Sequence, residues 1–186
     1  MTTDLTTPQG RAALAATYRS ALLDDVVPFW LRHGVDRENG GFLTALARDG
    51  AVIDTDKSVW FQGRGAWTFA TLYNTVDRRP EWLEAARGGI EFLRRHAAGP
   101  GGKMYFTVTR DGRPLRMRRY VYSESFAAIA NAAYARATGE ARAADDAVRH
   151  FATYLRHSFE PGVMPPKVSP ETRPMVGIGP HMIGIA

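Results

Sequence analysis

Arg48-Asp49-Gly50 is a short turn sequence that returns 62 positions later as Arg110-Asp111-Gly112. Each copy lies in a stretch typical of two strands around a turn, and each is followed by two segments with apolar residues at helical spacing. Five residues of these segments return 61 positions later: Tyr73, Ala86, Ile90, Leu93 and His96 correspond to Tyr134, Ala147, Phe151, Tyr154 and His157. The sequence therefore predicts a repeated unit of hairpin, helix and helix.

Local start and stop signals give the bounds of the expected elements. The hydroxyl and proline of Thr7-Pro8 predict a helix start, and this first helix is expected to reach about Leu31 with a kink at Pro28. The later elements are a hairpin over 42–53, helices over 61–75 and 80–96, a hairpin around Asp111-Gly112, helices over 124–138 and 140–157, and a helix of a third unit over 175–186.

Repeats of this length are typical of stacked helical units, because each unit buries its apolar face only against its neighbours. We therefore predict an all-α fold of the α/α toroid type, with helix pairs in inner and outer rings and small β-hairpins at one mouth. The chain supplies about half of such a ring and stops inside an apolar stretch at Ile183-Gly184-Ile185-Ala186. Residues 1–186 are thus expected to be the N-terminal part of a single toroid domain, as a fragment or short relative of a longer protein.

Composition excludes several classes of protein. Lys and Arg number 24 against 19 Asp and Glu, and the absence of cysteine excludes disulfides, thiolate zinc sites and a cysteine nucleophile. The densest basic cluster, over 110–119, lies in a predicted hairpin and not along one helix, so no nucleic-acid partner is expected. The start has no signal-peptide pattern and no apolar run approaches a membrane span, so a cytoplasmic protein without a membrane partner is expected.

Trp60-Phe61-Gln62-Gly63-Arg64 is the sharpest candidate site, because it opens a helix expected to face the toroid cavity. An indole offers a flat face to sugar C–H groups, and Gln and Arg offer donors to hydroxyls and oxyanions. Tyr122 holds the equivalent place in the second unit and is expected to face the same cavity. The alternative is structural: Trp60 in the core, Arg64 in a surface ion pair, and Ser123 and Glu124 stabilising a helix start.

The histidines divide into two groups. Four lie on or near outer-helix patterns and are expected to be structural: His33, His96, His150 and His157. His96 and His157 recur at matching helix ends, where an imidazole can satisfy free carbonyls. His181 lies on the predicted third-unit helix that faces the cavity, so it is a candidate ligand contact. No phosphate loop, zinc-protease or nucleophile-elbow motif is present, and no cofactor or metal is expected.

At these residues the sequence resembles the N-acylglucosamine 2-epimerase family, which also includes cellobiose 2-epimerases and mannose isomerases. The resemblance runs in order along nearly the whole chain. Its stretches are Phe29-Trp30-Leu31, Asp36 to Phe42, Val59 to Arg64, Thr109 to Pro114, Tyr122 to Phe126 and Arg173-Pro174-Met175.

The resemblance implies an (α/α)6 barrel and cofactor-free epimerisation or aldose–ketose isomerisation at C2 of an open-chain hexose, free or N-acylated. In the family, one histidine removes the C2 proton and a second returns a proton from the other face. The resemblance assigns oxyanion stabilisation to Arg64 and sugar binding to Tyr122, beside the candidate binding residues Trp60 and His181. The family's acid/base histidines lie in the second half of its fold, beyond Ala186, so that role is not transferred to His181.

Two other functions stay open from the residues alone. One is a non-catalytic carbohydrate-binding or scaffold half-toroid. The other is a toroidal glycosidase, which needs two carboxylic acids and finds only Glu124 well placed. For the chain as given we expect self-association, as a homodimer or by aggregation, through an apolar patch at Phe151, Tyr154 and 182–185, and no epimerase activity.

Overall fold

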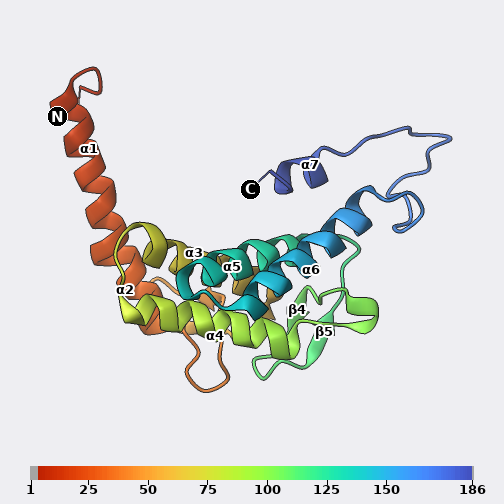
Figure 1. Ribbon diagram of the computed structural model, residues 1–186, viewed down its shortest axis with the longest axis horizontal. Helices are drawn as coiled ribbons and strands as arrows, with labels where there is room; N and C mark the ends of the chain where they lie inside the picture. The colour runs from red at the N-terminus through yellow and green to blue at the C-terminus, as the bar shows by residue number, and fades with distance from the viewer. Residues whose placement is uncertain (1–3, 186) are drawn as a thin grey trace.

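The computed structural model describes residues 4–185 and shows the two predicted units of hairpin and helix pair (Figure 1). The long helices are α1 (Pro8–Ser20), α3 (Val59–Thr75), α4 (Pro80–His96), α5 (Tyr122–Thr138) and α6 (Ala141–Phe159). The short ones are the π-helices η1 (Ala21–Val26) and η2 (Trp30–Gly34), α2 (Val27–Phe29), the 3-10 helix η3 (Pro100–Gly102) and α7 (Gly179–Ile183). The strands are β1 (Ala45–Leu46), β2 (Val52–Asp54), β3 (Lys57–Ser58), β4 (Thr107–Val108) and β5 (Pro114–Arg116).

The N-terminal helix starts as predicted, since the Thr7 hydroxyl accepts the Gly10 N–H at 3.0 Å. The expected disturbance at Pro28 takes the form of π-helical turns on both sides of α2. Proline has no N–H to continue the ladder of α-helical hydrogen bonds. The neighbouring Val27 N–H donates to the Leu22 carbonyl, five residues back. Figure 1 shows α1 projecting from the body of the molecule, and none of its residues is buried.

The two helix pairs form two layers. Helix α3 packs against α4 and α5, and α5 packs in turn against α6, so α3 and α5 lie side by side with α4 and α6 outside them (Figure 1). Small residues allow this approach: a Cβ on Gly63 of α3 would lie 2.8 Å from the backbone carbonyl of Phe126 on α5. The core between the layers holds fully buried Ala66, Ala70, Trp82, Ala86, Ile90 and Ala130.

The strands connect the units in a way that the sequence did not predict. β1 and β2 form the first hairpin, with Ala45 opposite Asp54. The second hairpin, β4 with β5, gains β3 as a third antiparallel strand, with Lys57 opposite Val108. Because β3 leads directly into α3, the start of α3 is attached to the hairpin that precedes α5.

Two histidines explain why the turn triplet repeats. His33 lies against Gly50 and Phe29, and His96 lies against Gly112 and Phe92, with ring centroids 5.1 and 4.8 Å apart in the two His–Phe pairs. Both glycines have positive φ, 90° and 92°, and a Cβ on either would collide with the imidazole. His96 therefore packs on a turn rather than satisfying a free carbonyl.

The other two outer-helix histidines also have structural contacts. His157 behaves as expected, since its Nδ1 bonds the Thr153 carbonyl at 2.9 Å. His150 is buried, and burial lowers its pKa to about 4, with the neighbouring Arg149 charge acting in the same direction. His150 therefore stays uncharged at neutral pH.

We expect Gly112→Ala to lower the free energy of unfolding by about 1–3 kcal/mol, because a side chain at positive φ is strained and its Cβ meets His96. Gly102→Ala is the matched control, since Gly102 has φ 80° and no atom within 4 Å of its Cβ position. Urea unfolding of both variants measures the difference. Equal losses would show that the imidazole contact adds nothing.

The C-terminal predictions are partly wrong. The helix expected over 175–186 is only the short α7, and Ala186 lies outside the described residues. The predicted apolar patch is exposed at Phe151 (44%), Met182 (62%) and Ile185 (84%). Tyr154 is instead fully buried, and its hydroxyl donates to the Pro180 carbonyl in the first turn of α7.

Candidate functional site

Arg64 lies on α3, one turn after Trp60, with its guanidinium against aromatic rings. The guanidinium carbon is 4.6 Å from the centroid of Phe126 and 5.3 Å from that of Trp60. Such stacking orients the guanidinium while its N–H groups stay available. Arg64 is exposed, and among residues 4–185 it makes no ion pair, so the predicted surface ion pair is not found. The arrangement leaves a positioned cation free to meet an anion.

Trp60 is the centre of a group that we call the aromatic cluster: Trp60, Phe106, Tyr122 and Phe126. The Trp60 ring centroid lies 5.5 Å from that of Phe126, 6.2 Å from Phe106 and 6.4 Å from Tyr122. Trp60 and Tyr122 are both half-buried, so neither is a pure core residue. The structure therefore places Trp60 next to both Arg64 and Tyr122, while a cavity shared by Arg64 and Tyr122 stays a prediction.

Sequence reasoning missed Phe106 and Phe126. A signal for Phe126 was present, because Arg64 and Phe126 are 62 positions apart, as are Trp60 and Tyr122. The two inner helices, α3 and α5, thus contact each other through equivalent positions of the repeat. No sequence signal marked Phe106, whose place depends on the pairing of β3 with β4.

Tyr122 connects the aromatic cluster to a cavity of about 530 Å³, which we call the Tyr122 cavity. His181 also lines this cavity, and its ring centroid lies 4.9 Å from that of Phe159. Burial raises the pKa of Tyr122, so its hydroxyl keeps its proton and can donate. Of the four predicted site residues, Trp60 and Tyr122 belong to the aromatic cluster, Arg64 stacks on two of its rings, and Tyr122 and His181 line the cavity.

The Tyr122 cavity is basic. Arg119 and Lys167 both line it, and the hydrogen bonds from Lys167 and then Arg119 lower the pKa of Tyr120. The Arg119 guanidinium also donates to the Pro165 carbonyl at 2.6 Å. No carboxylate of the described residues lines the cavity. Glu124 is fully buried, so the glycosidase interpretation has no exposed carboxyl here.

Two neighbouring predictions are wrong. Gln62 was expected to donate to a sugar, but it is fully buried, accepts the Phe42 N–H at 2.6 Å and donates to the Phe42 carbonyl at 2.8 Å. Ser123 was a candidate helix cap, but α5 starts at Tyr122 and the Ser123 hydroxyl donates to the Tyr105 carbonyl at 3.2 Å. Both side chains hold hairpin backbone against an inner helix.

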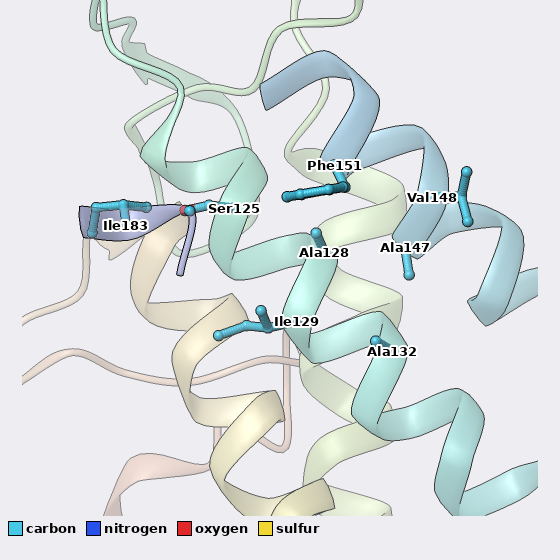
Figure 2. Close-up of a pocket in the computed structure, with 9 residues that line it drawn as sticks. Ser125, Ala128, Ile129, Ala132, Ala147, Val148, Phe151 and Ile183 are labelled. Atoms are coloured by element: carbon cyan, nitrogen blue, oxygen red, sulfur yellow. The ribbon is translucent and has the colours of Figure 1, made fainter. Parts of the chain in front are cut away.

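A second depression, of about 260 Å³, is apolar, in contrast to the basic Tyr122 cavity (Figure 2). It is lined by Ser125, Ala128, Ile129 and Ala132 of α5, by Ala147, Val148 and Phe151 of α6, and by Ile183 and Gly184. Figure 2 shows Phe151 pointing from α6 toward α5. Its one hydroxyl, on Ser125, already donates to the Tyr122 carbonyl at 2.9 Å. With so few polar groups, this surface does not suit a sugar.

Among residues 4–185, no group of three or more His, Asp or Glu side chains is placed to hold a metal ion. No helix in this part of the chain has the length and apolar character needed to cross a membrane.

A family model and individual known proteins indicate the same family. The model of the N-acylglucosamine 2-epimerase (GlcNAc 2-epimerase) family matches residues 40–186. The chain is 47% identical over 130 residues to the N-acylglucosamine 2-epimerase of Mus musculus, covering 68% of this chain and 31% of that protein. It is 32% identical over 145 residues to a cellobiose 2-epimerase of Ruminococcus albus, covering 76% of this chain and 36% of that protein.

A solved structure confirms the predicted fold. The cellobiose 2-epimerase of Spirochaeta thermophila matches with a TM-score of 0.71 and 28% identity, covering 82% of this chain and 37% of that one. The fold is thus part of an (α/α)6 barrel, and the chain spans about a third of the length of the curated relatives that it matches. With its family model matched over 40–186, the chain belongs to the N-acylglucosamine 2-epimerase family.

Proposed function

We propose that this chain supplies the oxyanion-binding face of a sugar 2-epimerase or aldose–ketose isomerase that acts on a free or N-acylated hexose. The observation that carries the proposal is the exposed Arg64 guanidinium, stacked on Trp60 and Phe126. The names of the relatives, N-acylglucosamine and cellobiose 2-epimerases, supply the substrate class.

The chemistry follows from removal of a proton next to a carbonyl. When a base takes the C2 proton of an open-chain sugar, negative charge moves onto the carbonyl oxygen of an enediolate. A cation fixed where this charge appears stabilises the transition state more than the substrate. Arg64 is proposed for this role, with the Trp60 face against sugar C–H groups and the Tyr122 hydroxyl as a donor. A proton then returns to C2 from the other face in epimerisation, or is added to C1 in isomerisation, without net oxidation, so the reaction requires no redox cofactor.

The base is not assigned within this chain. His33, His96 and His157 have the structural contacts described above, and His150 is buried. Among the described residues, His181 is the histidine that lines the Tyr122 cavity, and we propose it as a substrate contact.

A chimera tests the proposal. The segment of the mouse N-acylglucosamine 2-epimerase that aligns with this chain is replaced by the corresponding residues of this chain, and exchange of the C2 proton in deuterium oxide is followed by NMR. N-acetylglucosamine, cellobiose and mannose are the probes, and the parent enzyme is the control. Exchange with at least one sugar is expected. A folded chimera without exchange of any of them would refute the proposal.

A non-catalytic sugar-binding role is the second candidate. It is favoured by one observation: among the described residues, no pair of histidines lies in the aromatic cluster. Titration of the isolated chain with the same sugars, followed by tryptophan fluorescence, distinguishes the two. Binding by the chain together with an inactive chimera supports this second role.

We also propose that the isolated chain self-associates through the apolar depression of Figure 2, where Val148 is 71% and Phe151 44% exposed. Phe151→Glu is expected to shift the chain from dimer or larger species to monomer in sedimentation velocity. Arg142→Glu, an exposed position elsewhere on α6, is the control. A monomeric starting chain would contradict the prediction. The cytoplasmic location expected from the sequence stays a prediction.

A further inference from the structure

The two inner helices hold their hairpins through equivalent side chains. Gln62 lies in the first turn of α3 and Glu124 in the first turn of α5, 62 positions apart. The Gln62 Oε1 accepts the Phe42 N–H at 2.6 Å, and the Glu124 Oε1 accepts the Met104 N–H at 2.6 Å. Phe42 and Met104 are also 62 positions apart. The same clamp is therefore built twice.

The clamps differ in their second atom. The Gln62 Nε2 donates to the Phe42 carbonyl at 2.8 Å, which completes a two-bond contact with one backbone residue. The equivalent atom of Glu124 is Oε2, which is buried and has no hydrogen-bond partner among the described residues. A carboxylate accepts only, whereas a carboxylic acid has one O–H to donate. A proton on Oε2 makes Glu124 a chemical equivalent of Gln62.

We propose that Glu124 is a neutral carboxylic acid whose Oε2–H donates to the Met104 carbonyl, and that this contact positions the aromatic cluster. Met104 lies two residues before Phe106, and the Phe106 carbonyl accepts the Val59 N–H at 2.9 Å, next to Trp60. Glu124 is thus a positioning residue for the aromatic cluster, on which Arg64 stacks. Only its relevance to catalysis rests on the proposed function.

The surroundings of Glu124 favour the neutral form. Burial raises its pKa, against the opposing effects of the Met104 N–H, its own N–H, Lys103 and His157. Lys103, from the segment before β4, directs its ammonium to the Arg118 and Arg119 carbonyls. His157, on α6, bonds the Thr153 carbonyl through Nδ1. Both groups are thus hydrogen-bonded elsewhere.

Infrared spectroscopy tests the protonation state directly. The spectrum of the wild-type chain at about pH 7 is expected to contain the carbonyl stretch of a protonated carboxylic acid, and E124Q is expected to lose it. E84Q is the matched control, because Glu84 is exposed in an ion pair with Arg87 and is expected to leave the band unchanged. A wild-type spectrum without this band at about pH 7 would overturn the proposal.

Thermal unfolding supplies the second readout. A carboxyl whose folded pKa is raised stabilises the fold below its ordinary pKa, and that contribution is lost as the pH rises through the folded value. As the pH rises above the ordinary carboxyl pKa, the wild-type Tm is therefore expected to fall relative to the Tm of E124Q, which ends higher by about 2–4 °C. E124A, which leaves both Met104 groups unpaired, is expected to have a lower Tm at every pH. If E124Q behaves like E124A, a carboxylate is required and the proposal fails. Neither readout needs turnover, so failure of the proposed function leaves this test intact.

Discussion

Asp36→Asn is expected to lower the free energy of unfolding by about 3–5 kcal/mol, because it leaves a buried ammonium without its counter-ion. The Lys57 Nζ lies 2.8 Å from the Asp36 Oδ2, and both side chains are fully buried. The remaining hydrogen-bond partner of Nζ is the Gly40 carbonyl, at 2.7 Å, and Nζ also lies 4.4 Å from the centroid of the Phe92 ring. Arg110 also loses its two bonds to this carboxylate, at 2.9 and 3.0 Å.

Urea unfolding measures the effect, and two further variants interpret it. Asp36→Asn combined with Lys57→Met removes both buried charges and is expected to recover part of the loss. Glu84→Gln, in the exposed pair with Arg87, is the surface control and is expected to cost under about 1 kcal/mol. A loss for Asp36→Asn as small as the surface control would show that Lys57 is not held as a buried charge.

The same carboxylate predicts an acid dependence. Burial alone would raise the pKa of Asp36, but the hydrogen bonds from Arg110 and Lys57 outweigh it and hold the pKa well below its ordinary value. For such a group, the stabilisation is present above the ordinary pKa and is lost as the pH falls through the folded value. The difference between wild type and Asp36→Asn is therefore expected to begin to shrink as the pH falls below about 4 and to be lost only in strong acid.

Arg64→Ala in the mouse chimera is expected to lower kcat/KM for C2 exchange by about 10²–10³-fold, the usual loss when one oxyanion-stabilising group is removed. Its stability is expected to change little, because the guanidinium is exposed and its contacts are with the faces of two rings. Steady-state rates of deuterium incorporation at C2 measure the effect.

Two further arginine variants test whether the lower exchange rate comes from loss of the Arg64 guanidinium. Arg64→Lys keeps the charge but not the planar fork, so it is expected to recover only part of the rate. Arg87→Ala, at an exposed arginine of α4, is expected to leave the rate unchanged. An unaltered exchange rate in Arg64→Ala would show that this arginine does not stabilise the enediolate.

The elements predicted most accurately are those with local signals. The helix expected over 80–96 is α4 with the same bounds, since Pro80 starts it and a glycine-rich stretch follows it. The pairing of β3 with β4 was not predicted, because residues 57–58 reach a partner about fifty positions away and carry no local mark of it. The helix over 175–186 was overpredicted: apolar spacing alone does not fix its length, and only Gly179–Ile183 is helical.

The site was predictable at the positions that are equivalent in the two repeated units. Trp60 and Tyr122 hold equivalent positions in the repeat, and their rings are 6.4 Å apart, while a cavity that both face stays a prediction. Gln62 was wrong because a side-chain amide satisfies hairpin backbone as well as it satisfies a sugar, and sequence cannot separate the two. The roles of Arg64, Trp60, Tyr122 and His181 in binding or catalysis stay predictions.

The triad of Asp36, Lys57 and Arg110 has a consequence for how such chains can be lengthened or shortened. The acid comes from the loop before the first hairpin, the amine from β3, and the guanidinium from the turn of the second hairpin, 74 positions after the acid. Solenoid repeats with contacts only between neighbouring surfaces can be duplicated or deleted as cassettes. Here deletion of one unit would leave a buried charge without its partner. Insertion of a unit would move the two partners of an ion pair apart. The triad therefore makes the two units a single structural block.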